Sequence, residues 1–201
     1  MNALQLTPAS YISFLVLYRY YDRRYQALFG NAFSQGSTVQ NEQGVYMGFQ
    51  LTPIARWKLS VYADLFRFPW LKYGIDAPSG GQEYMAQIDY TPSRNYSTYL
   101  RYKYRQKEKN GTYENDNLLR INSYKQHRIR FQQVYNFSSP FIFKTSLDGI
   151  LFDDPIKKLN KGIMISQSIG WKPTTLPLQI DGYLAWFHTD AVSYTHLRAH
   201  E

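Results

Sequence analysis

The sequence contains no cysteine, which excludes disulfide bridges and thiolate zinc sites. It also lacks any uncharged apolar run of about 20 residues, the length that a membrane-spanning helix needs. Charged residues make up only 19% of the chain, and the mean hydropathy of −0.48 by itself is that of a water-soluble protein. What the chain has in quantity is aromatic side chains.

The aromatic residues comprise 19 Tyr, 12 Phe and 4 Trp, which excludes a disordered chain. Together with the missing helical spans, they leave a β-rich protein, either soluble or an outer-membrane barrel. The formal net charge is +8 and the isoelectric point is near 9.5. A basic balance suits nucleic acid, anionic lipid or an anionic solute, and it also serves solubility alone.

Apolar and polar residues alternate strictly along most of the chain. In 57–66, Trp57, Leu59 and Val61 share one face, and Lys58 and Ser60 share the other. A period of two is the pattern of a half-exposed strand. We therefore predict an all-β antiparallel meander. Most of its strands have roughly the 9–11 residues that a tilted strand needs to cross a bilayer. The nine predicted strands are 11–20, 44–51, 57–66, 84–91, 96–105, 124–135, 141–151, 162–171 and 178–188.

The predicted connections alternate in length. Those at 21–43, 67–83, 106–123 and 152–161 are long, and the intervening ones are short and contain proline. Long outer loops with short periplasmic turns, and aromatic residues at strand ends, are typical of outer-membrane barrels. A soluble β-sandwich, which also places aromatics at its rim, is the alternative. We predict that 1–191 is part of an outer-membrane barrel. Nine strands indicate a fragment, because bacterial barrels close with an even number.

The polar positions would line the lumen if the apolar face meets lipid. Arg101, Lys103 and Arg105 stack on one face of one strand, and such close like charges repel unless acids, water or an anion share the space. Two interpretations stand: a lumen that attracts anions, including nucleic acid, and a structural network that fills the barrel. The predicted lumen residues are the cations Arg19, Lys58, Arg101, Lys103, Arg105, Arg128, Arg130 and Lys144, with the acids Asp64, Asp89, Asp148 and Asp181.

Some residues depart from this pattern or have two interpretations. Gln133 and Gln167 fall on otherwise apolar faces, and Leu15 and Leu17 fall on a polar one. The long loop 21–43 either carries specificity by folding into or over the barrel, or is an ordinary surface loop. Its aromatic residues are Tyr25, Phe29 and Phe33.

Motifs for catalysis are sparse. Neither His127 nor His188 stands in a spacing that identifies a Ser-His-Asp arrangement, although outer-membrane hydrolases do place such residues on strand rims. His188 with Asp190, or His127 with Ser123, is therefore kept as an alternative. No Gly-rich phosphate loop or carboxylate metal loop occurs in the sequence. We predict a protein that is not an enzyme and uses no cofactor or metal.

The terminal stretch 192–201 breaks the alternation and resembles translated sequencing-adaptor read-through. We expect it to be an artefact and exclude it from the fold, as one would a cloning scar. Its His196 and His200, four residues apart, imitate half of a zinc site.

Residues 18–109 contain the stretches YRYYDRRYQALFGNAFSQGSTVQNEQGVYMGFQLTP, RWKLSVYADLFRFPWLKYGIDAPSGG and YTPSRNYSTYLRYKYRQKEK. They resemble the C-terminal barrel region of large outer-membrane proteins of Gram-negative bacteria, which are labelled helix-hairpin-helix proteins after a competence-type N-terminal part. The resemblance implies an outer-membrane location. The helix-hairpin-helix segment is absent from this chain, so no DNA-binding residue carries over.

These observations predict a non-enzymatic outer-membrane barrel fragment that transports or binds solutes at the surface. Its expected partners are outer-membrane lipid, an anionic solute or nucleic acid, and the remaining strands and N-terminal domain of the full-length protein. A DNA-binding or DNA-uptake protein and an outer-membrane hydrolase are the alternative functions.

Overall fold

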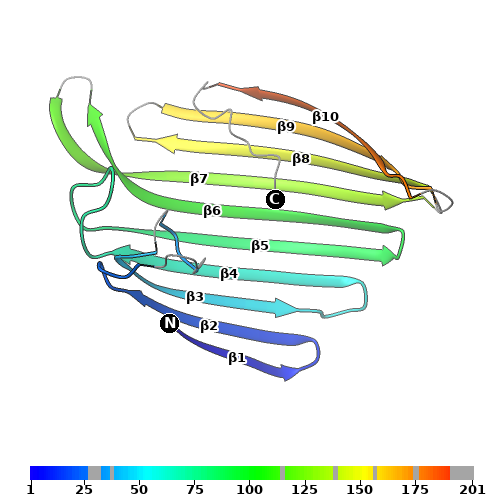
Figure 1. The fold of residues 1–201 in the computed structure, drawn as a ribbon, viewed down its shortest axis with the longest axis horizontal. Coiled ribbons are helices and arrows are strands. Elements are labelled where there is room, and N and C mark those ends of the chain that lie inside the picture. The colour runs from blue at the N-terminus through cyan, green and yellow to red at the C-terminus, as the bar shows by residue number, and fades with distance from the viewer. Residues whose placement is uncertain are drawn as a thin grey trace.

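The computed structural model describes residues 1–26, 33–36, 39–113, 116–137, 140–155, 158–173 and 177–190, without the side chains of 112, 113, 116–119 and 158. This part of the chain forms one antiparallel sheet of ten strands, in which each strand pairs with its sequence neighbours (Figure 1). The predicted all-β antiparallel meander is confirmed. The strands are β1 (Asn2–Ala9), β2 (Ile12–Tyr21), β3 (Glu42–Leu51), β4 (Trp57–Phe68), β5 (Ser79–Ser93), β6 (Tyr96–Tyr113), β7 (Asp116–Asn136), β8 (Phe141–Asp154), β9 (Lys158–Trp171) and β10 (Ile180–Thr189).

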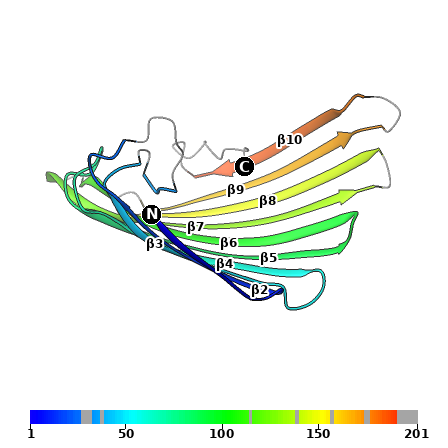
Figure 2. The same ribbon diagram turned by 60° about the horizontal axis from the view of Figure 1, so that its bottom comes forward.

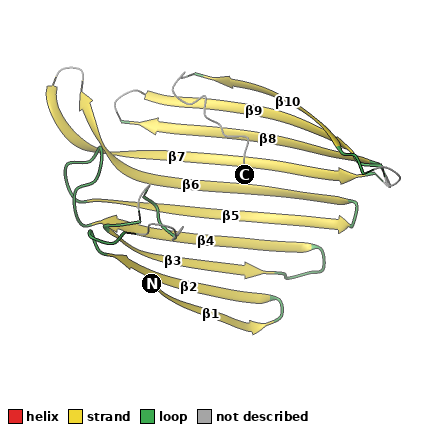
Figure 3. Cartoon of the chain, viewed as in Figure 1, coloured by secondary structure: helices red, strands yellow, loops and turns green. Residues whose placement is uncertain are grey.

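The described chain contains strands and loops only (Figure 3). Within it, no helix is long and apolar enough to cross a membrane. The sheet is open, because β1 pairs only with β2 and β10 only with β9.

The sequence prediction missed β1, so the predicted count of nine was wrong. β1 is an edge strand that carries Pro8, a residue tolerated at edges because it has no N–H to give to a neighbouring strand. Its pairing with β2 shifts register between Leu6 and Ala9, on either side of that proline. Ten is an even number, so the strand count no longer indicates a fragment. The open edges of the sheet at β1 and β10, each paired on one side only, are still consistent with a fragment.

Two of the predicted long loops, 106–123 and 152–161, are also largely strand. β6 ends at Tyr113 and β7 begins at Asp116, while β8 ends at Asp154 and β9 begins at Lys158. The 106–123 segment was missed because it is polar on both faces and lacks apolar alternation, whereas its strands are held by the backbone ladder. Figure 1 shows the resulting hairpin extending beyond the other strands. The long connections that remain are 22–41 and 69–78.

The sheet is curved (Figure 2), and residues 33–36, between β2 and β3, lie over its concave side. The concave face carries Arg19, Asp64 and Glu83, and the convex face carries residues such as Leu100 and Phe131. We call the edge with the connections 22–41 and 69–78 the loop end. The opposite edge, with the connections 10–11, 52–56, 94–95, 137–140 and 172–179, is the turn end.

The convex face bears an apolar band that no part of the described chain covers. Leu100, Ile129 and Trp186 are 50%, 52% and 60% exposed. On β4 the band runs from Trp57 to Leu65, and on β7 it runs from His127 to Tyr135. Where the band crosses the described strands, its convex positions include no Lys, Arg, Asp or Glu. Of the large hydrophobic side chains described, only a few are buried: Tyr21, Phe66, Phe68, Ile75 and Met164. The molecule therefore has a single-layer sheet rather than a packed interior.

A polar line ends the apolar band at the loop end. Its members are cross-strand neighbours: Arg67 Nε donates to Gln43 Oε1 at 2.8 Å, and Gln82 Nε2 donates to Gln106 Oε1 at 2.9 Å. The register then continues from Gln106 to Lys125, and from Lys125 to Asp153. The hydroxyls of two band tyrosines reach this line. Tyr84 donates to Gln82, and Tyr104 donates to Gln106, both at 3.0 Å.

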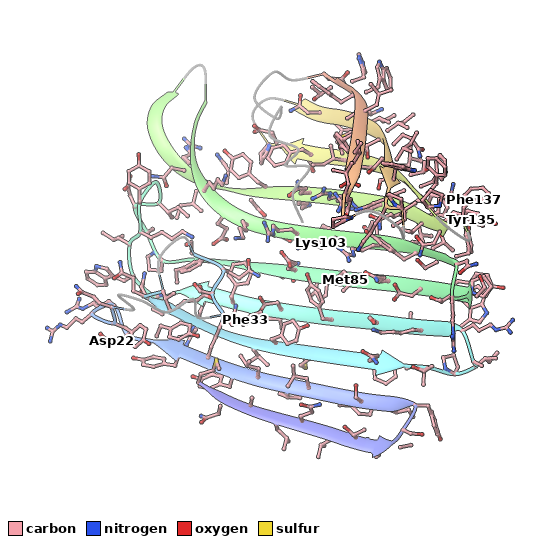
Figure 4. All side chains as sticks on the ribbon, turned by 45° about the vertical axis from the view of Figure 1, so that its right-hand side comes forward. Asp22, Phe33, Met85, Lys103, Tyr135 and Phe137 are labelled. Carbon is pink, nitrogen blue, oxygen red and sulfur yellow. The ribbon has the colours of Figure 1, made fainter. Side chains whose placement is uncertain are left out.

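Aromatic residues border the band at the turn end. The rings of Trp57 and Tyr90 lie 4.4 Å apart, and those of Tyr135 and Phe137 lie 4.5 Å apart, the latter pair labelled in Figure 4. Phe137 also contacts Phe143 at 5.5 Å. The aromatic clustering at strand ends that the sequence indicated thus becomes a row across neighbouring strands.

The apparent exceptions to the apolar pattern sit beside one another in the sheet. Thr98, Gln133, Thr145 and Gln167 are successive cross-strand partners on β6 to β9. Thr145 Oγ1 donates to Gln167 Oε1 at 2.6 Å, and Thr98 Oγ1 donates to the backbone carbonyl oxygen of Gln132 at 3.0 Å. Leu15 lies on the concave face opposite Gly48.

Candidate anion-binding face

The concave face gathers all of the residues predicted to line a lumen. Cross-strand partners lie on the same face, and the register pairs Lys58 with Asp89, Arg101 with Arg130, and Lys103 with Arg128. Continuing across the sheet, Arg130 pairs with Asp148. The remaining predicted residues, Arg19, Asp64, Arg105, Lys144 and Asp181, occupy positions of the same parity on their strands.

A buried ion-pair triad ties β2, β3 and β4 together. Arg19 Nε contacts Glu42 Oε1 at 2.5 Å, and Arg19 Nη1 contacts Asp64 Oδ1 at 2.7 Å. The side chains of Arg19 and Glu42 are fully buried, and that of Asp64 is 1% exposed. Gly44 faces Arg19 across the strands, and a Cβ there would lie 2.7 Å from the Arg19 guanidinium carbon. The glycine is therefore what leaves room for the arginine.

The segment 33–36 is bound to this triad. Both carboxylate oxygens of Glu42 accept from the backbone N–H of Gln35, at 3.0 and 2.8 Å, and Ser34 Oγ donates to Glu42 at 2.7 Å. Gln35 Nε2 donates to Asp64 at 2.8 Å. Phe33 lies edge-on to Tyr46, with ring centroids 5.2 Å apart, over the concave side of the sheet (Figure 4). The described part of the predicted loop thus covers the concave face. Phe29 lies outside the described residues.

Lys107 holds the same segment from β6. Its Nζ donates to the carbonyl oxygen of Gln35 at 2.9 Å. Burial, with the positive charges of Arg105 and Lys72, lowers the pKa of Lys107 to about 8. The residue lies beyond the polar line, in the part of β6 that was predicted to be loop.

A second centre forms around Glu83. Its carboxylate accepts from Tyr62 Oη at 2.6 Å, from Lys103 Nζ at 2.9 Å and from Arg105 Nε at 2.5 Å. Glu83 is directly opposite Asp64 in the sheet, so two carboxylates adjoin there. The two carboxylates are tolerated side by side because Arg19 on β2 neutralises Asp64, whereas Lys103 and Arg105 on β6 neutralise Glu83.

A third centre forms around Asp148. Arg130 Nε contacts its Oδ1 at 2.7 Å, and Arg128 Nη2 contacts the same atom at 3.3 Å. Arg128 Nε and Asp148 Oδ2 are buried and have no hydrogen-bond partner among the described residues. Two cations thus share one carboxylate oxygen, while the other accepts no hydrogen bond from the described part of the chain.

Three predicted cations make no contact with an acid. Arg101 Nε donates to the neutral side chain of Gln87 at 2.6 Å, and Gln87 in turn donates to Asp89 at 2.7 Å. Neither Lys58 nor Lys144 has an ion-pair partner among the described residues.

The sequence prediction overlooked two acids, Glu42 and Glu83. Each precedes the first residue of a predicted strand, at 44 and 84, yet each keeps the two-residue phase of the concave face. With them, the eight predicted cations face six acids rather than four, and the structure adds two further concave cations, Lys107 and Lys109, beyond the polar line. The positive excess is concentrated on β6 and β7, where Arg101 opposes Arg130 and Lys103 opposes Arg128.

His127 and His188, the two histidines considered for catalysis, lie on the convex face. His127 Nδ1 is 2.8 Å from Tyr102 Oη, and the hydroxyl of Ser123 accepts from Gln106 instead of contacting His127. His188 Nε2 lies 3.7 Å from Asp190, and both side chains are largely exposed. Among the described residues no group of three or more His, Asp or Glu could hold a metal ion. His196 and His200 lie outside the described residues.

No protein-family model, curated protein or solved structure matches this chain. The resemblance to outer-membrane proteins labelled helix-hairpin-helix therefore stays a prediction.

Proposed function

We propose that this sheet is part of the wall of an outer-membrane β-barrel, whose convex face meets lipid and whose concave face takes up or binds anionic solutes. The observation that carries the proposal is the exposed apolar band. On β4, β6, β7 and β9 it spans nine residues, as in 57–65 and 127–135, and on β8 it spans eleven, 141–151. Tilted strands of about 9–11 residues cross a bilayer, and the lipid-facing band of such barrels is about 25 Å tall.

The borders of the band support the same proposal. In lipid, tyrosine and tryptophan settle at the headgroup level, with the ring in the apolar region and the polar atom toward water. Tyr84 and Tyr104 follow this pattern, because their hydroxyls donate to Gln82 and Gln106 at the polar line. The row that contains Trp57 and the 135–143 aromatics would mark the opposite interface.

The solute preference is argued from the concave face. Between the polar line and the turn end, β6 and β7 carry five cations there, and the acids come from the neighbouring strands: Glu83, Asp89 and Asp148. Lys103, Arg105 and Arg128 remain 31–37% exposed despite their ion pairs. A concave surface with an excess of accessible cations raises the local concentration of anions.

The test begins with the full-length gene product, without the 192–201 stretch, refolded into detergent or lipid. Samples are run unheated and heated on a denaturing gel, with circular dichroism alongside. A heat-modifiable band with β-type dichroism supports a closed membrane barrel. A protein that is folded, soluble and monomeric without any amphiphile overturns the proposal, and the band would then be the face of a sandwich.

A polyanion such as DNA is the second candidate ligand, favoured by a row of cations on β6. Arg101, Lys103, Arg105, Lys107 and Lys109 alternate on the concave face over eight residue steps, or about 27 Å. The last two lie beyond the polar line, on the extended hairpin. If this row binds nucleic acid, affinity for a DNA oligonucleotide falls steeply as salt is raised, because phosphate contacts release counterions. Affinity that is unchanged by salt would exclude this ligand.

A further inference from the structure

A small cavity of about 180 Å³ lies on the concave face between β7 and β10, outside the triad and the Glu83 centre. Three cross-strand rows form it. Arg130, Asp148 and Met164 make one row, Gln132, Ser146 and Ser166 make the second, and Lys144, Ser168 and Tyr183 make the third.

We propose that this cavity is a binding subsite for a small anion that also carries hydroxyl groups, the chemistry shared by sugar acids and sugar phosphates. This rests on the proposed function, since it assumes that solutes reach the concave face, and it adds the ligand class and the place. Lys144 and Arg130 are the groups that would hold the negative charge.

The charge of the cavity supports an anion. Its one acid, Asp148, is already paired with Arg130 and Arg128. Lys144 has no ion-pair partner among the described side chains, although Asp148 lies on the same face of β8 four residues further on. An unpaired ammonium group beside an arginine leaves the cavity net positive, and oxyanions are the natural ligands of such a pair.

The remaining lining supports a ligand with hydroxyl groups. Ser146, Ser166, Ser168 and Tyr183 place hydroxyls around the cavity, and a hydroxyl both donates and accepts. Gln132 adds an amide. Asp148 Oδ2 is a buried acceptor to which no described residue donates, a condition that costs free energy until a donor reaches it. A simple carboxylate such as acetate has no hydroxyl to offer these groups.

The test uses isothermal titration calorimetry on the folded full-length protein with three probes: glucuronate, acetate and glucose. Glucuronate combines charge and hydroxyls, acetate has only the charge, and glucose has only the hydroxyls. We expect glucuronate to bind at least about tenfold more tightly than either single-feature probe, since hydrogen bonds to a charged group are stronger than those between neutral groups and only glucuronate makes both kinds. A glucose 6-phosphate arm distinguishes a sugar phosphate from a sugar acid as the better source of the anion.

The variants locate the site. Lys144→Met should weaken glucuronate binding by about tenfold, and Lys144→Arg should retain the binding. Lys58→Met is the matched control, because Lys58 is also a concave cation without an ion-pair partner among the described residues but lies outside the cavity. This variant should leave the affinity for glucuronate within about twofold of the wild type. Equal weakening by Lys144→Met and Lys58→Met would show a general field and overturn the proposal, as would absence of binding to the wild type. The heat-modifiable band is read on the same samples. A folded barrel that does not bind glucuronate refutes the subsite alone, whereas a soluble monomer refutes the proposed function.

Discussion

Replacing Arg19 with methionine should be among the most damaging single changes in this sheet. The substitution keeps an unbranched side chain of similar length but removes the charge between Glu42 and Asp64, whose side chains are 0% and 1% exposed. Breaking a buried pair by removing one partner costs about 3–5 kcal/mol, because it leaves an uncompensated buried charge.

The structure places the expected cost at the lower end of that range. Glu42 keeps donors from Ser34, Gln35 and Gly36, and Asp64 keeps the amide of Gln35. We therefore expect Arg19→Met to lower the free energy of unfolding by about 3 kcal/mol. Arg94→Met is the matched control, since Arg94 is exposed in the turn between β5 and β6 and should change stability by less than about 0.5 kcal/mol.

The assay is a urea titration of the refolded protein, followed by tryptophan fluorescence, with stability taken from the transition midpoint. The triple variant Arg19→Met, Glu42→Gln, Asp64→Asn removes the stranded charges and should recover part of the loss. Two results would refute the reasoning: an Arg19→Met cost no larger than that of Arg94→Met, or a triple variant no more stable than the single one. Either would mean that water reaches the triad in solution.

Three further predictions follow from the two faces of the sheet. Leu100→Arg, at the middle of the apolar band, should cost about 2–4 kcal/mol in lipid vesicles, whereas Leu151→Arg, next to the polar line, should cost about 0–1 kcal/mol; equal costs in the vesicle folding titration would contradict a lipid-facing band. The lowered pKa of Lys107 disfavours its charged form in the folded state, so the unfolded state binds more protons between about pH 8 and 10.5 and stability should rise with pH across that window. Lys107→Met should flatten that rise in unfolding titrations, and an unchanged slope would exclude Lys107 as its source. In a planar bilayer, Arg101→Gln should reduce the anion selectivity measured from the reversal potential in a salt gradient, and Arg94→Gln should not, because only Arg101 lies on the concave face; equal selectivity in both variants would rule out a role for Arg101.

The sequence predicted best where one face of a strand is apolar. In 57–66 and 141–151 the alternation located the strands within a few residues, since the period of two is a local property of the chain. It failed at 106–123, where both faces are polar and only the backbone ladder between β6 and β7 shows that the segment is strand. The sequence prediction also missed β1, because this edge strand shows no regular alternation of its own and is identified as a strand only by its pairing with β2.

In the candidate site, too, some features could be predicted from the sequence and others depend on the tertiary structure. Which residues share the concave face follows from their parity along each strand, so all the predicted cations could be placed there from sequence. Which cation meets which acid depends on the register between strands. Arg105 is paired with Glu83 because residue 83 lies opposite residue 105, a relation between two segments that neither contains alone.

By itself, the amino-acid sequence determined the all-β class, the antiparallel meander and the polar and apolar faces, because these depend on the order of neighbouring residues. Only the tertiary structure decided the ten-strand count, the burial of Arg19 between two carboxylates, the covering of the concave face by 33–36, and the cavity at Lys144. Each of these depends on residues far apart in the chain, such as Arg19 and Asp64, whose distance is set by the register and curvature of the whole sheet.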